Sequence, residues 1–316
     1  MSAMTNDDRL VVATPATRAG SGLLVALVSA ASFGLSGPLA SGLLATGWSP
    51  GALVLVRVGL AALVLTPLGL RSLRGRAGVV RRSLRLVVLY GVLAVAVCQF
   101  CYFSAVQRLD VGLALLIEYT SPLLILAWLW LRHGHRPGRL TLVGAALSVA
   151  GLLLVLDLVG GVSPDAVGVL WALAAMVGGA SYFLINADAS IGLPPLALAW
   201  LGLVVGAVVL ALLGVAGLMP LHASGGAVAL AGGRTPWWVP VVLLGVVTAA
   251  LAYTTGVVAG RLLGARLASF VALVEVVAGV LFAWLLLDQL PHAVQLVGGL
   301  LVLAGVVTVK LGERDA

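Results

Sequence analysis

The sequence RHGHRPGRLTLVGAALSVAG, residues 132–151, returns in altered form as LLDQLPHAVQLVGGLLVLAG at residues 286–305. A shift of 154 positions places Leu142-Val143-Gly144 on Leu296-Val297-Gly298 and Ala150-Gly151 on Ala304-Gly305. The match extends without a gap over Leu89–Val155 and Leu243–Val309, where 18 of 67 pairs are identical. A chain of this apolar composition would give roughly a tenth by chance, so the sequence contains an internal duplication.

The loops that precede the two copies carry different amounts of positive charge. The first, Arg132–Arg139, contains three arginines, whereas its counterpart Leu286–Ala293 contains none. Short cytoplasmic loops of membrane proteins are rich in Lys and Arg, and short external loops are poor in them. We therefore expect the two copies to lie upside down relative to each other in a membrane, as they do in many secondary transporters.

Composition supports membrane insertion and argues against other classes. The chain of 316 residues is 62% hydrophobic and 9% charged, with a mean hydropathy of +1.19, whereas soluble domains carry about 25% charged residues. The net charge of +7 does not indicate nucleic-acid binding, because the basic residues lie between apolar segments. Cys98 and Cys101 are expected to pack on one helix face, since no further metal or redox ligands accompany them.

Ten apolar segments predict an all-α membrane protein with ten transmembrane helices, arranged as two inverted five-helix repeats. The spans are expected near residues 20–41, 50–70, 86–106, 112–131, 140–158, 167–187, 195–217, 237–259, 267–286 and 292–310. The chain then divides into a cytoplasmic tail at 1–19, a first repeat at 20–158, a linker at 159–166, a second repeat at 167–310 and a cytoplasmic tail at 311–316.

The positive charges also predict how the spans are oriented. With both termini in the cytoplasm, 15 of the 18 basic residues lie in cytoplasmic segments, two lie in external loops, and Arg57 lies inside the second span. The opposite orientation would violate the positive-inside rule at almost every loop. We expect a multi-pass protein of the cell inner (plasma) membrane.

Three ionisable side chains lie well inside predicted spans, namely Arg57, Glu118 and Glu275. Such a group costs ~2.5–3.5 kcal/mol at the bilayer centre, so each needs a reason. Pro122 lacks the amide that would bond the carbonyl of Glu118, so the fourth span should kink there. The repeat offset places Glu275 on Ser121, less than one turn from Glu118. One carboxylate per repeat predicts a central site for substrate or protons, unless each only pairs with a helix hydroxyl or with Arg57.

Other side chains are candidates for the same site, although a single Tyr or Ser in a membrane helix often bonds a neighbouring helix instead. Arg57 is expected to be structural, either extending toward the outer interface or neutralising a buried carboxylate. Pro38, with Gly34 and Gly37, should loosen the first span as Pro122 does the fourth. The expected substrate-binding residues are Glu118, Glu275, Gln99, Tyr182, Asn186, Tyr253, Ser121 and Phe33.

These residues resemble the drug/metabolite transporter superfamily, in particular the EamA type with two five-helix repeats. The matching features include Trp48-Ser49-Pro50 followed by Arg57, Leu142-Val143-Gly144 with Ala150-Gly151, and Gly264-Ala265 leading to Glu275. The run Ile117-Glu118-Tyr119-Thr120-Ser121-Pro122-Leu123 is similar to the fourth-span motif of the threonine/homoserine exporter branch. The sequence departs from the family in two places. Val276 stands where a Pro usually follows the glutamate that matches Glu275. The acidic residue that usually opens the tenth-span region is here Asp288, followed by Gln289. The resemblance implies export of small metabolites through a cavity between the repeats.

The sequence therefore predicts a secondary transporter that exports small metabolites, amino acids or related compounds first among them, by alternating access. Proton-coupled efflux of drugs or other cations is the alternative, because buried glutamates suit a cation or a proton. A membrane scaffold is less favoured, since the extramembrane parts are too small for a binding domain. An enzyme is least favoured, because all four His fall in loops and no catalytic motif is present.

The expected partners follow from this prediction. They are a small-molecule substrate, protons if transport is coupled to them, and membrane lipid, but not nucleic acid. We expect no cofactor and no metal, because the sequence contains no nucleotide-binding motif and no metal-ligand cluster. The protein is expected to be a monomer or a homodimer.

Overall fold

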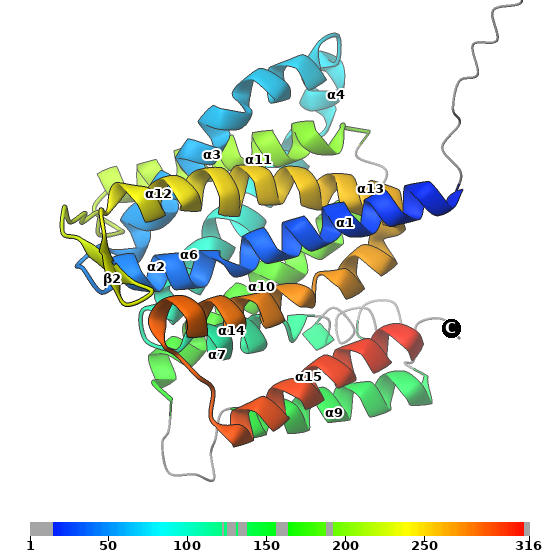
Figure 1. Ribbon diagram of the computed structural model, residues 1–316. Coiled ribbons are helices and arrows are strands. Elements are labelled where there is room, and N and C mark those ends of the chain that lie inside the picture. The colour runs from blue at the N-terminus through cyan, green and yellow to red at the C-terminus, as the bar shows by residue number, and fades with distance from the viewer. Residues whose placement is uncertain are drawn as a thin grey trace, which may run out of the picture.

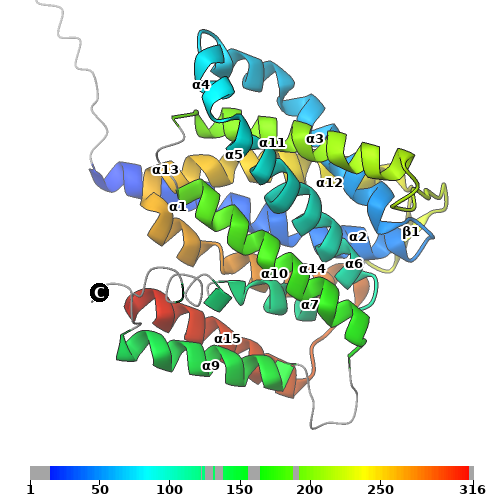
Figure 2. The same ribbon diagram turned by 180° about the vertical axis from the view of Figure 1, so that it is seen from behind.

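A computed structural model describes residues 15–121, 123–124, 131, 138–155, 164–187 and 192–312. These residues form a bundle of helices with one short antiparallel hairpin at one end (Figures 1 and 2). The first part of the chain contains α1 (Pro15–Gly34), α2 (Ser36–Leu44), α3 (Pro50–Leu73), α4 (Ala77–Arg82), α5 (Leu84–Leu89), the π-helix η1 (Tyr90–Val97), α6 (Cys98–Val106), α7 (Val111–Glu118) and α9 (Arg139–Val155). The second part contains α10 (Ala166–Ala187), α11 (Pro195–Val215), β1 (Val228–Leu230), β2 (Gly233–Thr235), α12 (Trp238–Gly245), the π-helix η3 (Val246–Leu251), α13 (Ala252–Val271), α14 (Val274–Leu287) and α15 (Ala293–Gly312).

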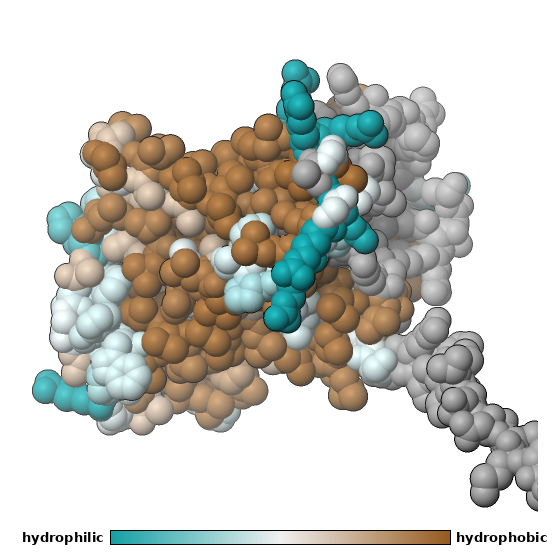
Figure 3. All heavy atoms as spheres, turned by 90° about the horizontal axis from the view of Figure 1, so that it is seen from above, coloured by the Kyte–Doolittle hydropathy of each residue, from teal (hydrophilic) through white to brown (hydrophobic). Residues whose placement is uncertain are grey.

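Many of these helices are long and apolar enough to cross a membrane. Within the described residues, five segments reach that length and four shorter apolar helices accompany them. Figure 3 shows the matching surface, a broad hydrophobic band between more polar ends. Residues 122 and 125–130 of the predicted fourth span, 112–131, lie outside the described residues. The count of ten spans therefore stays a prediction.

The internal duplication is visible where α9 and α15 lie side by side (Figures 1 and 2). A methyl group on Gly144 would lie 2.6 Å from the carbonyl oxygen of Gly305, and one on Gly151 would lie 2.6 Å from that of Gly298. The two contacts exchange under the 154-residue offset, and the numbering runs in opposite directions along the two helices. Ser148 Oγ donates to the carbonyl of its own counterpart, Val302, at 3.5 Å. The two helices are therefore antiparallel and related by a pseudo-twofold axis.

Replacing Gly305 by alanine should weaken this seam. The added methyl would lie 2.5 Å from the backbone nitrogen of Ser148, closer than real Cβ contacts allow, so the backbones must separate. Overpacking of this kind costs about 1–3 kcal/mol. Thermal unfolding in detergent measures the effect. Gly260→Ala is the matched control, because no atom of the described residues lies within 4 Å of a methyl there. Equal melting temperatures for the two variants would contradict the expectation.

The π-helices occupy equivalent places in the two repeats. η1 ends at Val97 and η3 ends at Leu251, and these residues are 154 positions apart. Each π-helix packs against the second long helix of the other repeat, η1 on α11 and η3 on α3. A π-helical turn is rare and often marks a functional site. Because both repeats contain a π-helix at the equivalent position, the two equivalent spans share the same local geometry.

Helix breaks also recur in the two halves. α1 ends at Gly34, four residues before Pro38, and α7 ends at Glu118, four residues before Pro122. A proline cannot donate to the carbonyl four residues earlier, so both breaks lie where the sequence predicts them. In the second repeat α13 ends at Val271 and α14 begins at Val274 without a proline.

The predicted boundary between the eighth and ninth spans is wrong. The sequence places a loop at 261–266 because of two arginines, but α13 continues as a helix to Val271. Glu275 consequently lies in the first turn of α14 rather than in the middle of a span beginning near 267. Arg261 and Arg266 were interpreted as a loop, but both lie within α13, because a charged side chain does not interrupt the backbone hydrogen bonds of a helix.

Loops predicted to be external meet at one end of the bundle. Asp165 Oδ1 accepts from the amide of Gly168 at 2.8 Å, and this bond, together with Arg108, holds the pKa of Asp165 below its usual range. The links between loops are Trp48 Nε1 to Ser224 O (2.8 Å), Ser49 Oγ to Pro220 O (2.7 Å), Ala231 N to Leu286 O (2.8 Å), Val111 N to Gln289 Oε1 (3.4 Å) and the ion pair Arg108–Asp165 (3.3 Å).

Candidate functional site

Glu118 lies at the end of α7, where the helix gives way to a turn at Tyr119 and Thr120. Its Oε1 accepts a hydrogen bond from the thiol of Cys98 on α6 at 3.5 Å. Across from it on α10 is Gly179, and a methyl group there would lie 3.8 Å from the same oxygen. The side chain is half-buried. Gly179 therefore lies within van der Waals range of the carboxylate and brings no polar side chain to it.

Glu275 lies next to Glu118 through one intervening side chain. Tyr119 Oη donates to Glu275 Oε2 at 2.5 Å, and Tyr119 follows Glu118 directly in the chain. The charges of the two glutamates are close enough to interact. Gly34 fixes the start of α14, because a methyl there would lie 2.9 Å from the carbonyl oxygen of Glu275. The breaks in α1, α7 and α13–α14 thus bring one carboxylate from each repeat into one cluster.

Aromatic rings from both repeats extend this cluster. The Phe33 and Tyr253 rings meet edge to face with centroids 5.1 Å apart. Tyr182 lies 6.3 Å from Tyr253 and 6.0 Å from Tyr90. Tyr253 is 2% exposed, whereas Phe33 and Tyr182 are only half-buried. We call Glu118, Tyr119, Glu275, Phe33, Tyr182 and Tyr253 the central cluster.

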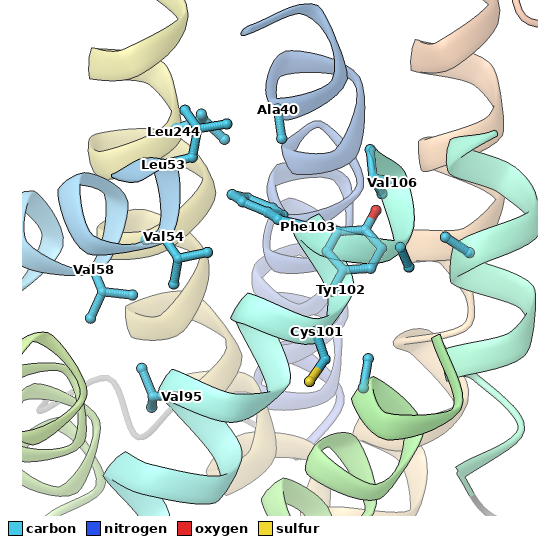
Figure 4. Close-up of a cluster of buried hydrophobic side chains, with 14 of the residues drawn as sticks. Ala40, Leu53, Val54, Val58, Val95, Cys101, Tyr102, Phe103, Val106 and Leu244 are labelled. Atoms are coloured by element: carbon cyan, nitrogen blue, oxygen red, sulfur yellow. The ribbon is translucent and has the colours of Figure 1, made fainter. Parts of the chain in front are cut away.

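Arg57 is buried beside the cluster, with 2% of its surface exposed. Its Nη1 donates to Gln99 Oε1, and its Nη2 donates to the carbonyl of Thr248 in η3 at 2.7 Å. The guanidinium lies 5.3 Å from the centre of the Phe103 ring, within range of a cation–π interaction. Figure 4 shows Phe103 and Tyr102 packed among Ala40, Val54 and Leu244.

One of the two roles predicted for Arg57 is wrong, because the buried side chain does not extend to the outer interface. Its hydrogen bonds go to an amide oxygen and a backbone carbonyl, while its charge also acts on the carboxylates of Glu118 and Glu275. A π-helical turn displaces backbone carbonyls from the regular α-helical pattern, which makes such a carbonyl available to a side chain. Arg57, which lies on the second span, therefore connects the third span, through Gln99, with the eighth span, through Thr248.

The remaining predicted site residues fall into three groups. Gln99 contacts Arg57, so its amide oxygen is already used within the protein. Ser121 and Pro38 are buried beside the helix breaks, Ser121 with 2% of its surface exposed. Asn186 belongs to α10, but its side chain is outside the described residues, as is the whole of Pro122.

Two contacts of the cluster were not predicted from the sequence. Cys98 was expected to be a packing residue, yet its thiol contacts Glu118. Tyr119 was part of the family-like motif, but only the fold shows that its hydroxyl reaches Glu275, which is 156 residues away. The glycine pair Gly202/Gly206 packs closely against η1, whereas a methyl group on Gly260 would meet no atom of the described residues within 4 Å.

Two carboxylates with aromatic neighbours can accept hydrogen bonds from an ammonium group or exchange protons. A search of curated proteins finds no match. A solved crystal structure of a protein matches with a TM-score of 0.63 and 23% identity, over 94% of this chain and 98% of the other; this likeness shows the fold alone. The EamA-like transporter family matches twice, at residues 20–157 and 166–311. The chain therefore belongs to the EamA-like transporter family, which makes it a multi-pass membrane protein and implies a membrane transporter.

Proposed function

We propose that the protein is a secondary transporter whose substrate carries an ammonium group, with amino acids and related compounds as the first candidates. The observation that carries this proposal is the hydrogen bond from Tyr119 to Glu275 beside Glu118. It brings one carboxylate of each repeat together. The rings of Phe33, Tyr182 and Tyr253 contact one another, and both tyrosines lie within range of the charge of a glutamate. Carboxylates neutralise an ammonium, and ring faces stabilise it by cation–π interaction.

The substrate is proposed to bind at the central cluster, between the two repeats. The antiparallel α9 and α15 seam and the equivalent π-helices support an inverted arrangement of the repeats. In that arrangement the pseudo-twofold axis lies in the membrane plane, and alternating access exchanges the conformations of the two halves. Export of amino acids, as in the threonine/homoserine exporter branch, is the specific form suggested by the motif around Glu118.

Proton-coupled efflux of larger cations is the second candidate. The same pair of carboxylates favours it, because two acidic groups close together can release protons when a cation binds. The two candidates differ in what they transport and in their need for a pH gradient, so one assay separates them.

Purified protein in liposomes provides that assay. Radiolabelled threonine, homoserine, a polyamine and a cationic dye are loaded one at a time, with and without a pH gradient. Efflux of an amino acid through the wild-type protein but not through Glu118→Gln would support the first proposal. Efflux of the dye only with a proton gradient would support the second. Movement of anionic metabolites alone would exclude both.

We also propose that both termini are cytoplasmic and that the protein lies in the inner membrane. Exposed small residues at the two ends of the bundle test the orientation. Ala223→Cys should react with an impermeant thiol reagent in intact cells, whereas Gly78→Cys should react only after lysis. Cys98 and Cys101 are buried and give the background. Labelling of Gly78→Cys alone in intact cells would reverse the topology.

A further inference from the structure

A cavity of about 330 Å³ lies between α7, α14 and α15, and its described lining includes none of the residues of the central cluster. Its walls are almost entirely apolar. They include Leu113 and Leu116 of α7, Val280 and Ala283 of α14, and Gly299 and Leu303 of α15. α15 packs closely along α9, but on the side toward α7 and α14 this cavity intervenes.

The cavity is continuous with the surface that faces the bilayer. Val277, Leu296 and Leu300 belong to its lining and are 56%, 48% and 68% exposed. Side chains around an empty space of this size lose dispersion contacts on one side. In a membrane, the medium that reaches such an opening is the hydrocarbon of lipid, and water is disfavoured because the walls offer few polar partners.

The length of the cavity approaches that of one leaflet of a bilayer. On α15 the lining runs from Gln295 to Leu303, a distance of eight residues. At 1.5 Å per residue this is about 12 Å, against about 15 Å for half of the ~30 Å hydrocarbon core. One acyl chain can therefore lie along the cavity from the interface toward the membrane centre.

Among the described lining residues, polar groups occur at only one end of the cavity. Asp110, Gln289 and Gln295 lie at the rim, where α7 begins and α14 passes into α15. The amide oxygens of both glutamines accept backbone amides within the protein, which leaves their nitrogens as donors. The carboxylate of Asp110 suits an ammonium, and amide nitrogens suit ester and phosphate oxygens.

We propose that this cavity is a lipid-binding site that holds one acyl chain of a phospholipid, with an ethanolamine headgroup at Asp110, Gln289 and Gln295. The site does not depend on the transport function, because it requires only that the protein lies in a membrane. Its occupant fills the space between the α9–α15 pair and the rest of the bundle.

The test uses the whole protein reconstituted with phosphatidylethanolamine that carries a diazirine near the end of one acyl chain. After illumination, mass spectrometry of peptides should find adducts at Val280 and Leu303. Leu63 on α3, which is 71% exposed, reports contact with bulk lipid. Gly299→Phe fills the cavity and should lower the adducts at Val280 by at least roughly fivefold, because the ring takes the room of the chain. Adducts at Leu63 should not change.

Gly260→Phe is the matched control, since the same substitution there meets open space. Val277→Trp, on the bilayer-facing side of the opening, provides a second variant in case Gly299→Phe does not fold. Adducts at Leu63 without any at Val280 or Leu303 would overturn the proposal. So would yields at Val280 that neither variant lowers, or cross-links from α14 and α15 to a second copy of the chain in place of lipid.

Discussion

Glu118→Gln should reduce transport by roughly ten- to a hundredfold, because an uncharged amide forfeits the ~1.5–3 kcal/mol of a charged hydrogen bond to the substrate. Glutamine has nearly the same volume, and the thiol of Cys98 can still donate to its oxygen. The fold should therefore be retained, as circular dichroism and thermal unfolding in detergent would show. The measurement is the initial rate of efflux from liposomes.

Glu275 provides the control for this interpretation. If both carboxylates bind the same ligand, Glu118→Gln and Glu275→Gln should not be additive, and residues in one network couple by ~0.5–3 kcal/mol. Tyr119→Phe keeps the ring but removes the donor to Glu275, so it should resemble a mild form of Glu275→Gln. Strictly additive losses, or normal affinity in Glu275→Gln, would assign Glu275 a structural role.

Arg57→Met should cause the second large effect, a loss of about 3 kcal/mol in the free energy of unfolding. Met has a similar length but leaves Gln99 Oε1 and the carbonyl of Thr248 without their donor, and a buried unsatisfied acceptor costs ~1–3 kcal/mol. The loss can be measured by titrating the protein with SDS in mixed micelles. Arg57 joins segments that are 191 residues apart, so the whole bundle should be affected.

Arg57→Lys separates charge from geometry. A lysine ammonium is a point donor and cannot reproduce the fork that reaches both acceptors, so this variant should lie between Met and wild type. In a protein that already carries Gln99→Leu, Arg57→Met should lower the free energy of unfolding by less, because one of the two acceptors is then absent. Stability equal to wild type in Arg57→Met would show that these hydrogen bonds contribute little net energy.

The helical class and the repeat could be predicted because each rests on local sequence. Membrane-length apolar runs and the 154-residue offset are visible without any contact, and the prolines at 38 and 122 predict the breaks at Gly34 and Glu118. The start of α14 could not be predicted in the same way. No proline marks it, and arginines at 261 and 266 were equally compatible with a loop or a helix end.

The candidate site was predictable in its acids but not in its contacts. An ionisable residue in an apolar run is conspicuous, and this identified Glu118, Glu275 and Arg57. Which neutral groups face them depends on tertiary packing between helices far apart in the chain. The contacts of Cys98 with Glu118 and of Arg57 with a carbonyl of η3 therefore required the fold.

The α9–α15 seam has a consequence for how the two halves of the chain pair. In the language of oligomers it is an isologous interface, since Gly144 meets Gly305 as Gly151 meets Gly298. Such self-complementary surfaces are what two separate copies of one half-length polypeptide use to pair. The two halves of this chain therefore meet at the seam as two copies of one half-length polypeptide would. The pairing of Ser148 with Val302 rather than with another serine marks one position where the halves differ.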